Sequence, residues 1–205
     1  FERTVAKART KNSIRAFTKL TETVDGELRI SSQPPLLVPI RELTDIDGEE
    51  LMSRLNEVLR NFRRTLQGDR RALLEQFRLV DVARKVVGVG SVGTRAWVAL
   101  LIGRDEGDPL FLQVKEAQQS VLEPYLGRSR HANHGRRVVG GQRLMQSASD
   151  IFLGWNRTNG IDGLERDFYM RQLWDWKASL EIETVKPAGF VIYAGICGET
   201  LARSH

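Results

Sequence analysis

Three glycines and a lysine form the part of this sequence best suited to chemistry. The glycines follow a Gly-x-Gly-x-x-Gly pattern at Gly88, Gly90 and Gly93, between two runs rich in apolar residues. Because glycine has no Cβ, closely spaced glycines let backbone N–H groups approach an anion. Lys115 ends a later apolar run and would present a point charge that suits a phosphate. The pattern therefore indicates a cradle for phosphate groups.

The glycine spacing alone is weak evidence, and two interpretations compete with a phosphate-binding lid. In the first, the glycines form an ordinary β-turn and Lys115 is a surface residue. In the second, the segment binds a dinucleotide: residues 85–89 are a strand and residues 92–101 are the helix that follows it. Glu116 then lies 23 residues after Gly93, near the ~20 expected for an acid that binds the ribose. Against the second interpretation, no further alternation of strands and helices follows to build a parallel sheet.

The third interpretation is kinase-like: the glycine loop joins two antiparallel strands, and Lys115 lies on the third strand, 22 residues after Gly93. Backbone amides of the loop would cover the phosphates of a nucleotide, and the lysine would neutralise them. A helix after the third strand, followed by another strand, is also the order of a kinase small lobe. The amides in question belong to Gly88, Gly90, Ser91, Val92 and Gly93.

The elements expected before the loop are mostly helical. Residues 2–20 carry an approximate helical stripe of apolar residues. Residues 22–30 read as a hairpin, because Asp25-Gly26 is a strong signal for a two-residue turn.

A long helix follows Asp47, which is a suitable N-cap. We expect Gly68 to close that helix and Asp69 to cap a shorter one that ends near Phe77. The residues expected on the apolar face of the long helix are Leu51, Leu55, Val58, Leu59, Phe62 and Leu66.

From Phe77 onward the composition shifts to β-branched residues. Strands are expected over residues 82–87, 97–102 and 110–115, with a turn at 103–109. Three consecutive strands with short connections predict an antiparallel meander.

Later segments predict a helix over residues 135–152 and a strand over 168–173. Residues 187–205 are a helix candidate weakened by three glycines. The inner positions expected for the first helix are Val138, Val139, Leu144, Met145, Ala148 and Phe152.

Composition bounds the class of protein. The 205 residues carry a formal net charge of +5, which suits phosphate-bearing ligands and makes a nucleic-acid partner unlikely. Cys197 is the one cysteine, so we expect a reducing, cytoplasmic setting and a buried side chain. No run reaches the ~20 apolar residues of a membrane helix. Because the chain starts at Phe1 and ends without a stop signal, we expect a fragment of a longer protein.

Other groups of residues point to structure rather than chemistry. His131 and His134 lack neighbouring ligands of suitable spacing, so we expect a solvated loop and no metal site. Trp155, Trp174 and Trp176 are expected to fill core or hinge positions.

Four blocks in order resemble a bacterial family, domain of unknown function 2252. They are residues 81–95 (DVARKVVGVGSVGTR), 111–117 (FLQVKEA), 141–150 (GQRLMQSASD) and 169–173 (YMRQL). The resemblance is good over roughly residues 80–205 and looser before them. It implies a relation to the protein kinase-like superfamily, which includes the aminoglycoside phosphotransferases, and it implies a fold more firmly than an activity.

This sequence departs from the family pattern in two respects. In the family, a Gly-Asp-Ala-His block with a following Asn, and a later Asp-rich block, precede the glycine loop and resemble catalytic and metal-binding loops; neither block is found here. The helix after the third strand also lacks a Glu to pair with Lys115, so the orienting acid is open.

These observations predict an α+β protein: a helical region with a short hairpin over residues 1–79, then an antiparallel sheet with a packed helix and a C-terminal helical segment over residues 80–205. The leading hypothesis is binding of ATP with Mg and phosphoryl transfer to an unknown acceptor. The alternatives are a catalytically inactive nucleotide-binding or protein-interaction module and, with less support, an NAD(P)-binding oxidoreductase.

Overall fold

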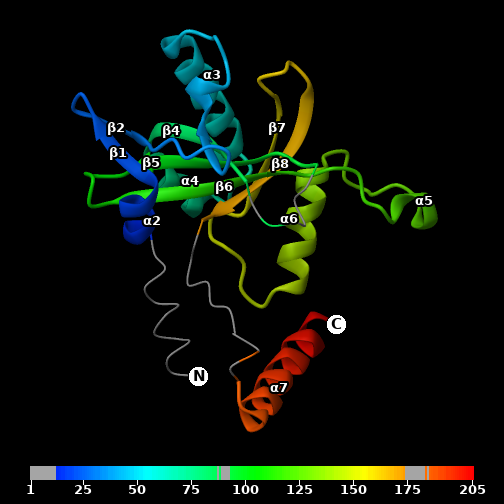
Figure 1. The fold of residues 1–205 in the computed structure, drawn as a ribbon. Helices are drawn as coiled ribbons and strands as arrows, with labels where there is room; N and C mark the ends of the chain where they lie inside the picture. The colour runs from blue at the N-terminus through cyan, green and yellow to red at the C-terminus, as the bar shows by residue number, and fades with distance from the viewer. Residues whose placement is uncertain (1–12, 87, 89–92, 174–182, 184) are drawn as a thin grey trace.

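A six-stranded sheet is the centre of the fold (Figure 1). The computed structural model describes residues 13–86, 88, 93–173, 183 and 185–205. The strands are β1 (Thr21–Val24), β2 (Glu27–Ile30), β3 (Leu37–Pro39), β4 (Arg78–Lys85), β5 (Ala96–Ile102), β6 (Pro109–Glu116), β7 (Gly154–Asn159) and β8 (Glu165–Gln172). The helices are α2 (Ser13–Leu20), the short 3-10 helix η1 (Ile40–Glu42), α3 (Gly48–Arg63), α4 (Gly68–Glu75), α5 (Glu123–Leu126), α6 (His134–Met145) and α7 (Pro187–Ser204).

The order of strands in the large sheet is β3-β4-β5-β6-β8-β7, and each described pair is antiparallel. The meander predicted for β4, β5 and β6 and the α+β class are therefore confirmed. Six of the seven residues of β5 are buried, as expected for a central strand with a core on each face.

The dinucleotide interpretation is wrong because residues 96–101 of its expected helix, 92–101, belong to the strand β5 (Ala96–Ile102). Val92 lies outside the described residues, but residues 97–101 of that segment pair with both β4 and β6. Trp97 and Val98 suit a pleated surface better than a helix packed closely on a sheet.

The turn between β5 and β6 holds the two strands in register. Within residues 103–109, the Gly103 amide donates to the Asp108 carbonyl at 2.9 Å, and the Asp108 amide donates to the Asp105 carbonyl at 2.9 Å. A Cβ at Gly103 would collide with the Asp108 carboxylate. The turn is thus closed by its own hydrogen bonds, and Gly103 lets Asp108 come close.

The first hairpin and the N-cap of α3 are confirmed. Asp25 (φ 54°) and Gly26 (φ 81°) both have positive φ between β1 and β2, as a two-residue turn of type I′ requires. The Asp47 side chain accepts a hydrogen bond from the Glu49 amide at 2.9 Å, which satisfies one of the free donors at the start of α3.

The predicted junction between α3 and α4 is wrong in detail. α3 ends at Arg63, Gly68 begins α4 instead of closing α3, and the N-cap of α4 is Gln67. Asp69 lies inside the first turn of α4, where its charge favours the helix N-terminus.

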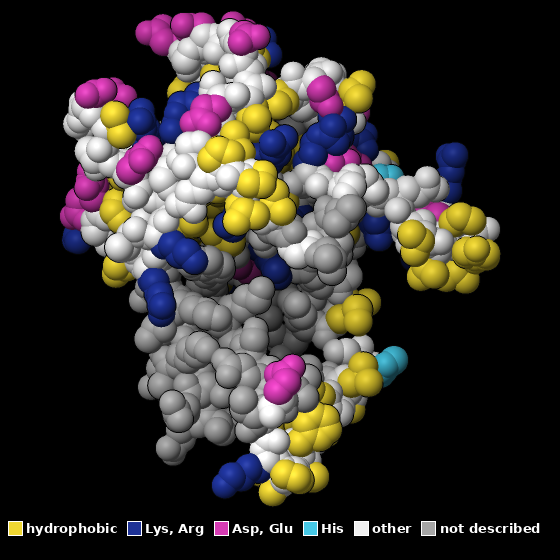
Figure 2. Space-filling model, viewed as in Figure 1, with side chains coloured by type: hydrophobic (Ala, Val, Ile, Leu, Met, Phe, Trp, Pro, Cys, Tyr) yellow, Lys and Arg dark blue, Asp and Glu magenta, His cyan; other side chains and the backbone are white. Residues whose placement is uncertain are grey.

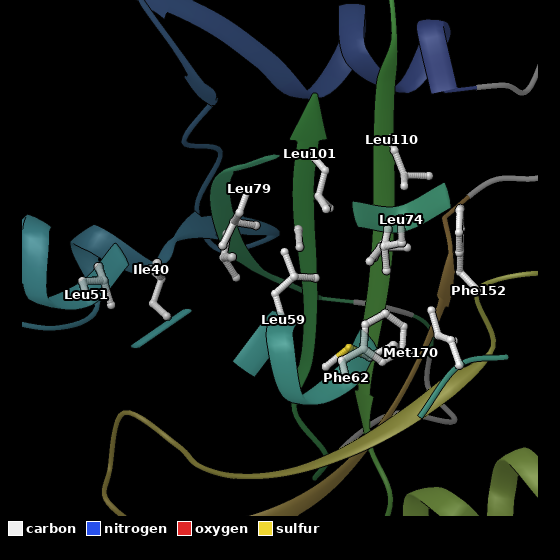
Figure 3. Packing of buried hydrophobic residues seen from close by; sticks show 14 residues of the cluster. Ile40, Leu51, Leu59, Phe62, Leu74, Leu79, Leu101, Leu110, Phe152 and Met170 are labelled. Carbon is white, nitrogen blue, oxygen red and sulfur yellow. The ribbon is translucent and has the colours of Figure 1, made fainter. Parts of the chain in front are cut away.

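Two cores lie on opposite faces of the sheet. Figure 1 shows α3 on one side of the sheet and α2 and α6 on the other. In Figure 3, Leu59 and Phe62 of α3 lie over the strands that carry Leu79, Leu101 and Met170. The second core includes Ala16, Leu20, Ile30, Leu37, Ala83, Val98, Leu100, Ile102, Phe111 and Leu173.

Asp81 links the small hairpin to the sheet. Its side chain is buried, accepts hydrogen bonds from the Ile30 amide at 2.9 Å and the Val82 amide at 2.8 Å, and pairs with Arg41. A buried carboxylate needs such partners. Asp81, the first residue of the block that contains the glycine loop, is therefore structural.

Asp167 anchors the start of α6 to β8. It accepts hydrogen bonds from the His134 amide at 2.7 Å and from Asn133 at 2.8 Å, and it forms an ion pair with Arg157 at 2.6 Å. Burial raises the pKa of Asp167, but these bonds outweigh burial and leave the pKa below its usual value. A Cβ at Gly135 would meet the backbone of Phe168, so α6 begins in close contact with β8.

The helix predicted over residues 135–152 is shorter than expected. α6 ends at Met145, and Leu144 and Met145 are exposed, contrary to the inner positions predicted for them. Ala148 is also exposed, whereas Val139 and Phe152 are buried as predicted. Gln146, the residue directly after α6, has an extended backbone (ψ 132°) and directs the chain away from the helix axis.

The sequence analysis did not predict β7. This strand reads Gly-Trp-Asn-Arg-Thr-Asn, in which Trp155 is the sole large apolar residue. The Asn156 side chain donates to the Val58 carbonyl of α3 at 3.0 Å. Tertiary contacts of this kind, rather than an apolar pattern, hold the strand in place.

α7 confirms the predicted C-terminal helix, but none of its described residues is buried. Figure 2 shows hydrophobic side chains along this helix and over α5. Cys197 is exposed, so the prediction of a buried cysteine is wrong. Among the described helices, none is long and apolar enough to cross a membrane.

Candidate functional site

The glycine loop connects β4 to β5. Gly88 and Gly93 belong to the described residues, whereas the predicted site residues Gly90, Ser91 and Val92 lie outside them. Gly93 has φ +80°, a conformation that residues with a Cβ rarely adopt. β4 and β5 pair as a hairpin on either side of the loop, which both the β-turn and the kinase-like interpretations expect.

Lys85 and Lys115 lie in one row across the sheet. Ala96 of β5 is opposite Lys115 of β6, and the pairing of Arg84 with Trp97 places Lys85 of β4 on the other side of Ala96. Side chains in such a row point to the same face. At about 4.8 Å between neighbouring strands, the two lysine backbones lie about 10 Å apart, separated by the small Ala96.

This row opens into a cavity of about 810 Å³ that also contains Gly88. Strands β4, β6 and β8 form its floor, and α6 with the segment after it forms a wall. The other residues around it are Val86, Gln113, Gln142, Gln146, Ala148, Ser149, Asp150, Ile151, Arg171, Gln172 and Leu173. The structure therefore places Gly88 and Lys115 on the same cavity.

The cavity is basic. Lys85, Lys115 and Arg171 face one carboxylate, Asp150, among the described lining residues. Burial, together with the charge of Lys19, lowers the pKa of Lys85 below its ordinary value. A lysine held in this way lacks part of the solvation of its charge, and an anion would restore a favourable partner.

Asp150 is fixed in place by two backbone amides. Its Oδ1 accepts from the Phe152 amide at 2.8 Å and its Oδ2 accepts from the Gln172 amide at 2.9 Å. The carboxylate thus spans the end of β8 and the segment that leaves α6. The sequence analysis left the acid near Lys115 open, and the structure places Asp150 on the wall of the same cavity.

An ionic cluster holds the end of the glycine loop. The Arg95 amide donates to Glu116 at 3.0 Å, and the Arg95 guanidinium pairs with Asp162 at 2.9 Å. Arg166 forms two further bonds to Asp162, at 2.6 and 2.7 Å. These bonds, first among them those from Arg166, lower the pKa of Asp162 to about 2. Glu116, the acid expected to bind a ribose, is therefore engaged in the structure of the loop.

The remaining predicted residues lie away from this cavity. His134 begins α6, where its amide bonds Asp167, and Arg136 stacks 5.5 Å from the ring centre of half-buried Trp155. Trp174 and Trp176 lie outside the described residues. Within the described part of the chain, no group of three or more His, Cys, Asp or Glu residues could hold a metal ion.

Sequence reasoning missed Lys85, Asp150 and Arg171 as neighbours of Lys115. Lys85 could have been found from its position at the end of a strand next to the loop. Asp150 ends the block of residues 141–150, but no local pattern shows that this block reaches the cavity that Lys115 lines.

The comparison with protein families agrees with the sequence blocks. The model described as an uncharacterized protein conserved in bacteria (DUF2252) matches residues 1–205. No curated protein and no solved structure matches the chain. The match extends over all 205 residues, including the first 79, where the resemblance is looser. This chain therefore belongs to the DUF2252 family.

Proposed function

We propose that this chain is the nucleotide-binding part of a kinase-like phosphotransferase that uses ATP with Mg and an unknown acceptor. The observation that carries the proposal is the row of Lys85 and Lys115 on either side of Ala96, in a basic cavity next to the glycine loop. A glycine loop on a β-hairpin with a lysine on the next strand is the phosphate-binding half of a kinase site.

Each residue has a defined part in the proposal. Lys115 and Lys85 would bind the phosphate oxygens as point charges. Amides of residues 88–93 would cover the phosphates. Asp150, held by two amides, would orient Lys115 from the wall of the cavity. ATP with Mg would supply the phosphoryl group and the charge that neutralises it.

Thermal shift measurements test the proposal. We expect Mg-ATP to raise the melting temperature, whereas NAD leaves it unchanged. At a ligand concentration of 100 times Kd the free energy of unfolding rises by about 2.7 kcal/mol, which corresponds to roughly 5–11 °C for a chain of this size. Lys115→Met should abolish this shift.

Lys186→Met is the matched control, because Lys186 is exposed and precedes α7, outside the cavity. It should keep the full Mg-ATP shift. A shift that persists unchanged in Lys115→Met would remove Lys115 from its assigned part.

A non-catalytic module for nucleotide binding or protein interaction is the second candidate. It is favoured by exposed apolar side chains on α5 and α7, including Tyr125 (83% exposed), Leu126 (78%) and Val191 (71%), since exposed apolar patches mark interaction surfaces. An Mg-ATP shift without release of ADP in the presence of candidate acceptors would favour this candidate over a transferase.

A further inference from the structure

A second cavity lies on the opposite face of the sheet from Lys115. Its volume is about 370 Å³, within the range of small-molecule sites. Val114 lines this cavity and the adjacent Lys115 lines the basic one, because successive residues of a strand point to opposite faces. The two cavities are therefore separated by the thickness of the sheet.

Apolar side chains form most of its wall. Leu55, Val58 and Leu59 of α3 lie on one side, and the strands β4, β5, β6 and β8 form the floor. Figure 3 shows Leu59 of α3 and Leu79 of β4 in the same apolar cluster. The other apolar residues around the cavity are Ile40, Val82, Trp97, Ala99, Leu112, Val114, Ile161, Phe168 and Met170. Such a surface favours an apolar ligand over water.

Charged side chains also line this cavity: Arg84, Arg95 and Asp162. Arg95 is paired with Asp162 at 2.9 Å and with Glu116 at 3.4 Å. Arg84 is exposed, and its side chain has no hydrogen-bond or ion-pair partner in the described part of the chain. One guanidinium is therefore available beside an apolar cavity.

We propose that this cavity binds an apolar carboxylate, a molecule with a hydrocarbon body and one carboxylate end, such as a medium-chain fatty acid. The hydrocarbon fills the space between α3 and the sheet, and the carboxylate stays beside Arg84. A guanidinium matches a carboxylate with two parallel hydrogen bonds. The charge must stay at the rim, because burying a carboxylate among these side chains would be costly.

Calorimetry with octanoate and octan-1-ol tests the proposal, because the two ligands share a chain length and differ in charge. We expect octanoate to bind roughly tenfold more tightly than octan-1-ol, as for one charge-assisted hydrogen-bonded contact. Arg84→Met should reduce the octanoate affinity to that of octan-1-ol. Arg104→Met, which removes an exposed arginine of the β5–β6 turn, should leave both affinities unchanged.

Filling the cavity provides a second test. Ala99→Leu places a larger side chain on the floor, and Val114→Phe does so from β6; either variant that melts cooperatively should bind neither ligand. Equal affinities for the two ligands, an unaffected Arg84→Met variant, or no binding by the wild type would each overturn the proposal. Lys115→Met should keep octanoate binding. The outcome of this test is therefore independent of whether the protein binds a nucleotide.

Discussion

Replacing Gly135 by alanine should loosen α6 from the sheet. A Cβ at this position would lie 2.7 Å from the carbonyl carbon of Phe168 and closer still to its oxygen. Both atoms belong to the backbone of β8, so no side-chain rotation relieves the contact. The added methyl group forces the start of α6 outward and strains the bonds from Asn133 and His134 to Asp167.

The expected magnitude follows from overpacking a close contact, which costs about 1–3 kcal/mol in the free energy of unfolding. For a chain of about 200 residues, each kcal/mol corresponds to roughly 2–4 °C in melting temperature. We therefore expect Gly135→Ala to melt about 2–12 °C below the wild type.

Gly141→Ala is the matched control in the same helix. A Cβ at Gly141 would meet nothing within 4 Å, and alanine is favoured over glycine inside a helix by up to about 1 kcal/mol. This variant should melt about 2–4 °C above the wild type.

Circular dichroism and calorimetric melting of the three proteins give the comparison. α6 carries Gln142 and is followed directly by Gln146, and both residues line the basic cavity. Gly135→Ala should therefore also weaken the Mg-ATP shift. If Gly135→Ala were as stable as Gly141→Ala, the close contact between α6 and β8 would be refuted.

Three further changes test the electrostatics of the site. Lys85→Met should raise the melting temperature of the ligand-free protein, because the pKa of Lys85 is lowered and its charge therefore destabilises the fold below pH 10.5, the ordinary pKa. This gain in melting temperature should shrink as the pH rises toward 10.5. A variant less stable than the wild type at pH 7 would contradict the prediction. Asp162→Asn should lower the melting temperature at pH 5–7. The pKa of the carboxylate falls from 3.8 to about 2, so the carboxylate stabilises the fold above pH 3.8 and loses this effect as the pH falls toward 2. A difference in melting temperature from the wild type that is the same at pH 2 and pH 6 would rule out the carboxylate charge as its cause. Asp150→Asn should cost about 1.5–3 kcal/mol in unfolding free energy, the value of one hydrogen bond to a charged group. The Phe152 and Gln172 amides donate to different oxygens of Asp150, and asparagine has an NH2 group in place of one of them. Urea titration measures the loss, and an unchanged midpoint would contradict the prediction.

Local sequence signals predicted the elements that depend on local physics. Asp25-Gly26 predicted the first hairpin, Asp47 predicted the start of α3, and the β-branched runs predicted β4, β5 and β6. In each case the signal lies within a few residues of the feature that it determines.

Features that depend on distant contacts were missed or misjudged. β7 has no apolar alternation and is held by contacts with α3 such as Asn156 to Val58. The residues around Lys115 are set by strand register and by the path of the chain after α6. Lys85 lies across β5 from Lys115, and Asp150, in the segment after α6, lines the same cavity. No window of sequence contains these relations.

The turn at residues 103–109 determines which face of the sheet, and therefore which cavity, the Lys115 side chain points to. A strand that slips by one residue against its neighbour turns every side chain to the other face. A slip of β6 would move Lys115 among the apolar side chains beneath α3 and place Val114 in the basic cavity. The hydrogen bonds of Gly103 and Asp108, at the far end of β6 from Lys115, thus keep the basic side chain on one face of the sheet and the apolar side chains on the other. A one-residue deletion in this turn should therefore impair ligand binding in both cavities.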